Sequence, residues 1–255
     1  MKNYNIPNIP ERELKPRKKG LTMVMDKGLS VEEANNMLSA AGHLIDYVKL
    51  GFGTSYVTKG LEEKIRIYAK NDVNVFFGGT LFEAFLARDA TEEYIKLIQR
   101  FNLSYVEISD GTLNIPHELK LKFIEEFTKY FTVLSEVGSK NKDKEISDSQ
   151  WVEAMNLELE AGASYVIAEA RESGNIGVFD ESGSIKTGLV EHITQNVNTE
   201  KIIWEAPKKE QQVWFIKSFG TSVNLGNIAS NEVIPLETLR LGLRSDTFFD
   251  FLRLK

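Results

Sequence analysis

The sequence alternates short apolar runs with longer segments of helical character, and this alternation restricts the possible folds more than any other feature. The runs are almost continuously apolar and rich in β-branched and aromatic residues, which is typical of strands in a parallel sheet covered on both faces. They lie at residues 21–25, 47–50, 73–77, 105–108, 132–134, 165–168, 202–204 and 222–225. Each run with the segment after it forms a unit of about 32 residues, and eight such units are what a (β/α)8 barrel needs.

The segments between the runs repeat apolar residues at steps of three and four, which places those residues on one face of a helix. Ser30 and Glu33 have the spacing of a capping box at the start of the first segment. In the segment before the fifth run, we expect one face to pack against the barrel. Its residues are Leu119, Phe123, Phe127 and Phe131.

An open doubly wound sheet is the competing architecture. Such a sheet often carries a glycine-rich phosphate loop after its first strand. Gly51-Phe52-Gly53 begins the G-x-G-x-x-G pattern, but Tyr56 stands at the place of its third glycine, and no G-x-x-x-x-G-K-[ST] motif occurs. We therefore predict an α/β fold: a single-domain (β/α)8 TIM barrel at residues 21–255, preceded by a polar arm at residues 1–20.

The composition of the chain excludes several kinds of site and indicates its cellular location and partners. The 255-residue chain has no cysteine, which excludes disulfides, thiolate nucleophiles and thiolate zinc sites. No apolar run reaches the roughly 20 residues of a membrane span, and the N-terminus lacks the apolar stretch of a secretory signal. The formal charge of −6 gives no reason to expect nucleic acid as a partner. We therefore expect a cytoplasmic protein without nucleic-acid or membrane partners.

Charged residues end or interrupt most of the apolar runs. Glutamates stand in or just after the fourth to seventh runs, and a lysine lies inside the second; they are Glu107, Glu136, Glu169, Glu205 and Lys49. A charged group in a packed barrel interior costs several kcal/mol unless it is paired, hydrogen-bonded or bound to a metal. Converging carboxylates would repel one another, and a divalent cation would relieve that repulsion. Oxygen ligands without cysteine favour Mg²⁺ or Mn²⁺ over zinc.

A structural salt bridge with Lys49 or Arg171 explains any single one of these glutamates equally well. The complete set fits a functional site better than a set of structural pairs. Lysine is also the candidate proton carrier, because Lys140 directly follows the fifth run and Lys49 lies within the second. The histidines fall in helical segments that we expect to face outward, and no G-x-S-x-G elbow occurs. These histidines are His43, His117 and His192.

Two loops that follow apolar runs are longer than their neighbours. Residues 138–150 are polar and charged, whereas residues 172–188 are rich in glycine and suit a small hairpin around Ser182 and Gly183. In a barrel, both loops would lie at the carboxyl ends of the strands, where active sites are found. They are candidate lids, although ordinary surface insertions explain their length equally well.

Several segments, in this order, resemble the phosphosulfolactate synthase family: DYVKLGFGTS (46–55), FFGGTLFE (76–83), VEISDGT (106–112), SEVGSK (135–140), VIAEARESG (166–174), IIWEAPKKEQQ (202–212), VNLGNI (223–228) and LETLRLGLRSDT (236–247). The resemblance extends over almost the whole chain. It implies a (β/α)8 barrel, dependence on Mg²⁺, and addition of sulfite to phosphoenolpyruvate to give phosphosulfolactate, a step that leads to sulfolactate or coenzyme M. It also implies a homo-oligomer, such as a trimer.

The resemblance indicates one residue role, and the positions and chemistry of the other charged and amide residues suggest the rest. The SEVGSK match assigns the family's general acid to Lys140. Lys49 and Arg171 would hold the carboxylate, the phosphate or the incoming sulfite. Mg²⁺ would be held by Glu136, Glu169 and Glu205, with Glu107 in reserve. We expect the substrate phosphate to bind where the seventh and eighth strands end, at Lys208, Asn224, Gly226 and Asn227.

Three other functions remain open from the sequence. The first is a barrel aldolase that uses Lys49 or Lys140 as a Schiff base. The second is a divergent homologue that acts on another enol phosphate or another nucleophile, because variation in the loops adapts one barrel to many reactions. The third is a binding protein without catalytic activity, which the intact set of buried charges disfavours.

Overall fold

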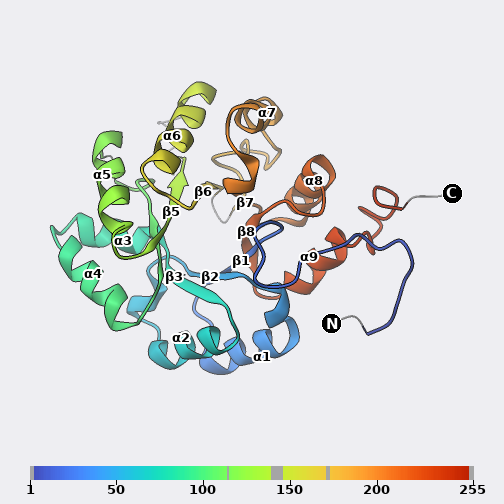
Figure 1. The fold of residues 1–255 in the computed structure, drawn as a ribbon, viewed down its shortest axis with the longest axis horizontal. Helices are drawn as coiled ribbons and strands as arrows, with labels where there is room; N and C mark the ends of the chain where they lie inside the picture. Colours follow the sequence, from blue (N-terminus) through green and yellow to red (C-terminus); the bar gives the residue numbers. More distant parts are fainter. Residues whose placement is uncertain (1–2, 114, 139–145, 171–172, 253–255) are drawn as a thin grey trace.

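The computed structural model describes residues 3–113, 115–138, 146–170 and 173–252. Eight parallel strands form one sheet that curls into a barrel (Figure 1). This confirms the predicted single-domain (β/α)8 TIM barrel. The strands are β1 (Thr22–Asp26), β2 (Tyr47–Leu50), β3 (Asn74–Phe77), β4 (Tyr105–Ile108), β5 (Thr132–Val137), β6 (Tyr165–Ala168), β7 (Ile202–Glu205) and β8 (Leu225–Ala229).

Helices cover the outside of the barrel (Figure 1). They are α1 (Val31–Ala41), α2 (Leu61–Lys70), α3 (Gly79–Leu86), α4 (Thr91–Arg100), α5 (His117–Phe127), α6 (Asp148–Glu160), α7 (Thr187–Asn196), α8 (Lys209–Phe219) and α9 (Val233–Arg240). Short 3₁₀ turns are η1 (Gly42–Leu44), η2 (Thr54–Tyr56) and η4 (Thr199–Lys201). The predicted capping box forms at the start of α1, where the side chains of Ser30 and Glu33 each accept a hydrogen bond from the other residue's backbone N–H.

The barrel has a seam between β3 and β4. Hydrogen-bonded neighbours run in the order β3-β2-β1-β8-β7-β6-β5-β4, so β3 and β4 share no backbone ladder within the described residues. A side chain bridges this gap, because the backbone N–H of Gly79 donates to Glu107 Oε1 at 2.7 Å. A Cβ atom at Gly79 would lie 2.2 Å from Ser109 Oγ, so the close approach requires glycine.

Two apolar cores lie on the two sides of the sheet. The large outer core packs the strands against the helices. The smaller inner core fills the barrel with Leu21, Met23, Tyr47, Phe76, Leu134, Ile167 and Ile203. Successive residues of a strand point to opposite faces, so a residue two positions after an inner core residue also points inward. Lys49, Glu136, Glu169 and Glu205 each stand two positions after such a residue.

β8 begins later than predicted, at Leu225 and not at residue 222. Its register against β1 shifts by one residue, because Thr22 pairs with Leu225 whereas Val24 pairs with Ile228. This bulge contains Gly226 and Asn227, and Asn227 has a left-handed φ of 57°. Glycine and asparagine interrupt the apolar pattern of the strand, which explains why the apolar run was a poor guide to its position.

The N-terminal arm lies beside α9 (Figure 1). From residue 3 to residue 20, it contains no helix or strand. Arg12 Nε donates to Glu237 Oε1 of α9 at 3.0 Å, and Arg17 Nε donates to Asp46 Oδ1, just before β2, at 3.1 Å. Buried ion pairs therefore fix the arm to the amino-terminal end of the barrel.

The long loop after β6 forms the predicted hairpin around Ser182 and Gly183. An antiparallel bridge joins Phe179 to Ile185, and the Asp180 N–H donates to the Ser184 carbonyl at 2.8 Å. Phe179 is buried in the outer core, which attaches the hairpin to the barrel wall. Most of the other predicted lid, residues 139–145, lies outside the described residues.

Candidate active site

Lys49 lies among carboxylates inside the barrel. Its Nζ atom is 2.9 Å from Glu107 Oε2, 2.8 Å from Glu136 Oε2 and 3.3 Å from Glu205 Oε1. The side chain of Lys49 is 7% exposed, and those of the three glutamates are 1–2% exposed. The fold thus brings together charged residues from β2, β4, β5 and β7, as the pattern of charges at the strand ends predicted.

Burial and pairing act on these charges in opposite directions. Burial alone would lower the pKa of Lys49, but Glu107, Glu136 and Glu205 outweigh it and hold this pKa well above its ordinary value. Burial raises the pKa of Glu107 to about 7, although Lys49 opposes the rise. These carboxylates therefore favour the charged ammonium form of Lys49. A Schiff-base nucleophile must be neutral, so this environment disfavours an aldolase mechanism at Lys49.

Glu136, Glu169 and Glu205 form a group that could hold a metal ion. Each offers one carboxylate oxygen, and these oxygens all lie within 4.8 Å of one another. All three residues are buried. A set of oxygen ligands at the carboxyl ends of three neighbouring strands suits a hard divalent cation. The sequence predicted this role for these three residues, with Glu107 in reserve, and Glu107 is not part of this group.

Donors from the neighbouring strands orient Glu205. The Ala170 N–H donates to Glu205 Oε2 at 2.9 Å, and Asn227 Nδ2 lies 3.5 Å from the same oxygen. Asn227 Nδ2 also donates to the Ala170 carbonyl at 3.2 Å. The bulge in β8 turns the Asn227 amide toward this site. Asn227 Oδ1 is buried and accepts no hydrogen bond within the described residues, so a further acceptor stands beside the carboxylates.

The remaining predicted site residues have different positions. Gly226 lies inside the barrel, where a Cβ atom would be 2.4 Å from Met23 Cε and 3.0 Å from Ile203 Cγ2, so a larger residue would displace these side chains. Lys208 is exposed just before α8. Its Nζ atom lies close to Gly183 of the hairpin, since a Cβ atom added to this glycine would be 3.1 Å from it. Lys140 and Arg171 lie outside the described residues, and their roles remain predictions.

The predicted position of Asn224 is wrong, because this residue precedes β8 and lies at the amino-terminal end of the barrel. Its Oδ1 atom accepts from the Leu21 N–H at 3.1 Å, and its Nδ2 atom donates to the carbonyls of Glu200 and Ile202, both at 3.1 Å. The error follows from the late start of β8. Asn224 ties three chain segments together at the end of the barrel opposite the carboxylates.

Asn224→Ala is therefore expected to lower the free energy of unfolding by about 1–3 kcal/mol, because it leaves buried backbone groups without partners. Urea denaturation of the variant measures this change. Its KM values should equal those of the wild-type protein at a temperature where both are folded. A higher KM with unchanged stability would instead support the original prediction of a substrate contact.

Sequence reasoning missed a buried lysine on α5. The buried residues of this helix are Lys120, Ile124 and Phe127, whereas the predicted contact residue Leu119 is 37% exposed. The spacing of 120, 124 and 127 fits a helix face and was the available signal. His117 also differs from the prediction that it faces outward, because it is half-buried and its Nε2 atom lies 3.2 Å from Glu158 Oε1.

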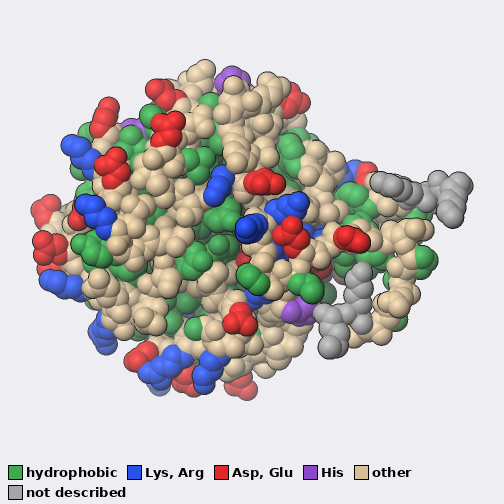
Figure 2. All heavy atoms as spheres, viewed as in Figure 1, with side chains coloured by type: hydrophobic (Ala, Val, Ile, Leu, Met, Phe, Trp, Pro, Cys, Tyr) green, Lys and Arg blue, Asp and Glu red, His purple; other side chains and the backbone are tan. Residues whose placement is uncertain are grey.

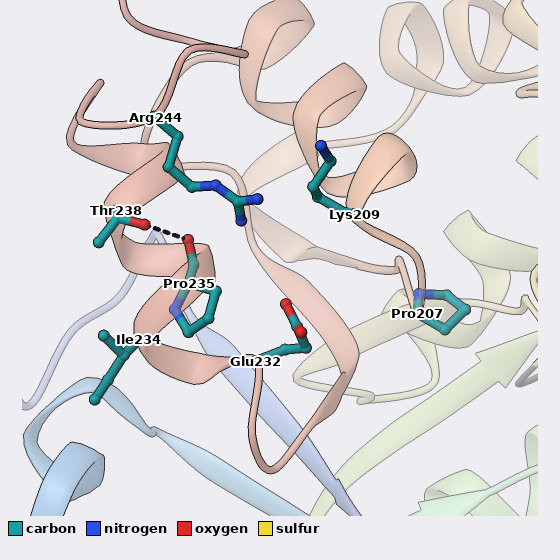
Figure 3. Close-up of a pocket in the computed structure, with 7 residues that line it drawn as sticks. All are labelled: Pro207, Lys209, Glu232, Ile234, Pro235, Thr238 and Arg244. Atoms are coloured by element: carbon teal, nitrogen blue, oxygen red, sulfur yellow. Dashed lines mark hydrogen bonds between the residues drawn. The ribbon is translucent and has the colours of Figure 1, made fainter.

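A separate cavity of about 530 Å³ lies between the starts of α8 and α9 (Figure 3). Figure 3 shows Arg244 and Glu232 extending into the space between the two helices. Lys209 at its edge binds Asp246 at 3.0 Å. Charges of both signs line this cavity, and it contains none of the glutamates described above. On the face shown in Figure 2, acidic and basic side chains are likewise mixed.

Within the described residues, no helix combines the length and the apolar character that crossing a lipid bilayer requires. The profile of the (2R)-phospho-3-sulfolactate synthase (ComA) family matches residues 10–246. A phosphosulfolactate synthase of Bacillus subtilis is 42% identical over 244 residues, which cover 94% of this chain and 97% of that protein. A phosphosulfolactate synthase of Methanothermobacter thermautotrophicus is 43% identical over 244 residues, which cover 93% of this chain and 95% of that protein.

Solved structures support the fold independently. A 3-hexulose-6-phosphate synthase matches with a TM-score of 0.56 and 13% sequence identity, over 86% of this chain and 98% of that one. At this identity the match concerns the barrel alone.

Proposed function

The chain belongs to the phosphosulfolactate synthase family, and we propose that it catalyses the Mg²⁺-dependent addition of sulfite to phosphoenolpyruvate to give phosphosulfolactate. One observation in the structure carries this proposal. Three buried glutamates offer oxygens within 4.8 Å of one another, at the end of the barrel where TIM-barrel enzymes have their active sites.

In this proposal, Glu136, Glu169 and Glu205 hold Mg²⁺, and Glu107 remains in reserve beside Lys49. Bound Mg²⁺ would supply Lewis-acid stabilisation of the negative charge that develops on the substrate carboxylate. Lys49 holds two of the ligands, Glu136 and Glu205, in place through contacts of 2.8 and 3.3 Å. The N–H of Ala170 and the amide of Asn227 restrain Glu205 from the other side.

The bond changes require one nucleophile and one proton. Sulfite sulfur forms a bond to the methylene carbon of phosphoenolpyruvate, and the electron pair of the double bond moves toward the carboxylate. A proton must then reach the carbon that bears the phosphate, and we assign its delivery to the Lys140 ammonium. Arg171 and Lys49 would bind the anionic groups, and Lys208, Gly226 and Asn227 would border the phosphate.

The proposal also covers the cellular location and the oligomeric state of the enzyme. We place it in the cytoplasm, because phosphoenolpyruvate carries several negative charges and does not cross membranes unaided. We also propose that it is a homo-oligomer, with a trimer as the arrangement that the family resemblance suggests. Sedimentation equilibrium of the purified protein would measure the assembly directly.

Purified protein with Mg²⁺, phosphoenolpyruvate and bisulfite is expected to consume both substrates and form a phosphorylated sulfonate. Phosphorus NMR follows the loss of the enol phosphate signal and the appearance of the product signal. Activity should disappear in excess chelator and return with added Mg²⁺, because the carboxylates would lose the cation that they hold. Full activity in chelator would contradict the metal proposal, and product formation with another nucleophile but not with sulfite would indicate a divergent homologue.

A further inference from the structure

A second buried group of charges lies behind the proposed metal site, between α5, α6 and the ends of β4 and β5. Lys120 of α5 is 1% exposed, and its Nζ atom is 2.9 Å from Asp110 Oδ1 and 2.8 Å from Glu158 Oε1 of α6. Glu158 is also 1% exposed and contacts His117 at 3.2 Å. The group thus connects two helices to the loop that follows β4.

The same ammonium group reaches the backbone of a proposed ligand. Lys120 Nζ donates to the carbonyl oxygen of Glu136 at 2.6 Å, near the carboxyl end of β5. The Glu136 side chain points to the inside of the barrel, toward Lys49 and the other two glutamates. Lys120 therefore holds Glu136 from the outer side of the sheet, while the carboxylate acts on the inner side.

Stability alone gives a weak reason for this arrangement. Burial opposes the charge on Lys120, and only the carboxylates of Glu158 and Asp110 raise its pKa above the ordinary value. Buried ion pairs are often no more stabilising than apolar side chains of the same volume. A charged group can nevertheless fix a geometry. The Lys120 ammonium is held by two carboxylates, and it therefore keeps the carbonyl oxygen that it contacts in a defined position.

We propose that Lys120 is a positioning residue, which sets the Glu136 carboxylate for metal binding by holding the Glu136 carbonyl with an ammonium group anchored on Glu158 and Asp110. This inference rests on the proposed metal site at Glu136, Glu169 and Glu205. Lys120 itself touches neither substrate nor metal in this assignment. Outer partners of metal ligands act in this way in other proteins by restricting the orientations of the ligand.

The chain offers a matched control on the other side of the barrel. Lys64 of α2 is also 1% exposed, and its Nζ atom is 2.9 Å from Asp26 Oδ2 and 2.8 Å from the Leu29 carbonyl. Like Lys120, it pairs with a buried carboxylate and a backbone carbonyl, whereas Lys120 has Asp110 as a second carboxylate partner. Its carbonyl partner belongs to a loop residue and not to one of the three glutamates.

The test compares Lys120→Met/Glu158→Gln with Lys64→Met/Asp26→Asn in the full-length protein. Each double variant removes a buried ion pair while nearly keeping its volume. In Lys120→Met/Glu158→Gln the remaining carboxylate, Asp110, has a side chain that is 28% exposed, so water can solvate its charge. Calorimetric titration with Mg²⁺ gives the Kd, and thermal unfolding gives the stability of each protein. We expect Lys120→Met/Glu158→Gln to weaken the Mg²⁺ Kd by about 10- to 100-fold. The control should keep the wild-type Kd even if its melting temperature falls equally.

The dependence of turnover on Mg²⁺ concentration provides a second readout, which would not change if Lys120 had a purely structural role. Raising the Mg²⁺ concentration should restore much of the lost activity in Lys120→Met/Glu158→Gln, because the defect lies in metal binding. A wild-type Kd in this variant, or equal weakening in both double variants, would overturn the proposal.

Two further outcomes are also decisive. If Lys120→Met/Glu158→Gln does not fold, the isosteric Glu158→Gln and Asp26→Asn variants replace the pair. Glu158→Gln must then weaken Mg²⁺ binding more than Asp26→Asn does, and equal affinities overturn the inference. If the wild-type protein binds no Mg²⁺, the proposed metal site is wrong, and the role of Lys120 falls with it.

Discussion

Lys140→Ala is expected to lower kcat by about 10²- to 10⁴-fold, because the variant loses the group that delivers the proton to the substrate carbon. Removal of this lysine should leave the fold and Mg²⁺ binding intact, since the proposed ligands are glutamates on other elements. Steady-state kinetics at saturating phosphoenolpyruvate and bisulfite measures the change. Calorimetry on the same variant checks that Mg²⁺ still binds.

Two nearby lysines provide matched controls for this prediction. Lys142 and Lys144 belong to the same polar segment, and each change to alanine removes the same charge as Lys140→Ala. We expect both control variants to retain wild-type kcat. Near-normal turnover in Lys140→Ala would show that the proton comes from another group, and equal losses in all three variants would indicate a general effect of charge.

Lys49→Met should lower the free energy of unfolding by about 3–5 kcal/mol at neutral pH, more than Asn224→Ala does, because it leaves buried carboxylates without their ammonium partner. Lys49 contacts Glu107, Glu136 and Glu205 at 2.8–3.3 Å, and all of these groups are almost completely buried. Chemical denaturation without metal gives the free energy of unfolding. Activity should also be lost, because Glu136 and Glu205 would no longer be held in place.

The pH dependence and a double variant test the electrostatic cause of that loss. Burial raises the pKa of Glu107 to about 7, above that of an unfolded glutamate, so the folded state holds more protons and its stability falls as the pH rises. Lys49 opposes this rise, so its removal raises the carboxylate pKa further, and the variant binds protons at a higher pH than the wild-type protein does. The loss of stability in Lys49→Met should therefore shrink as the pH falls from 8 to about 6. Adding Glu136→Gln should recover part of the stability. A deficit independent of pH and of Glu136→Gln would show that the loss comes from packing.

The bounds of several strands could be predicted from their apolar runs. β2, β4 and β6 have the predicted bounds, because most of their residues are apolar and buried; Lys49 in β2 and Glu107 in β4 interrupt the runs without displacing these strands. β8 could not be placed, since Gly226 and Asn227 form a bulge that has no apolar signature. The misplacement of Asn224 follows from the same cause.

Helix faces show a similar limit. On α5, apolar residues occur on more than one side, and the predicted face contained the exposed Leu119. The actual buried face includes Lys120, because Glu158 and Asp110 from other elements compensate its charge. Spacing along one helix carries no information about partners on another helix, so this residue could be found only from contacts.

The sequence by itself determined the repeating strand–helix units, the barrel that they form, and the family to which the chain belongs. It also indicated that Lys49 and four glutamates share one end of the barrel, since the carboxyl ends of parallel strands meet there. Only the tertiary structure decided which atoms meet: Lys49 with Glu107, Glu136 and Glu205, and Glu136 with Glu169 and Glu205 in a group that suits a cation. Local propensity depends on near neighbours in the chain, whereas these distances depend on strand register, the bulge in β8 and the closure of the barrel.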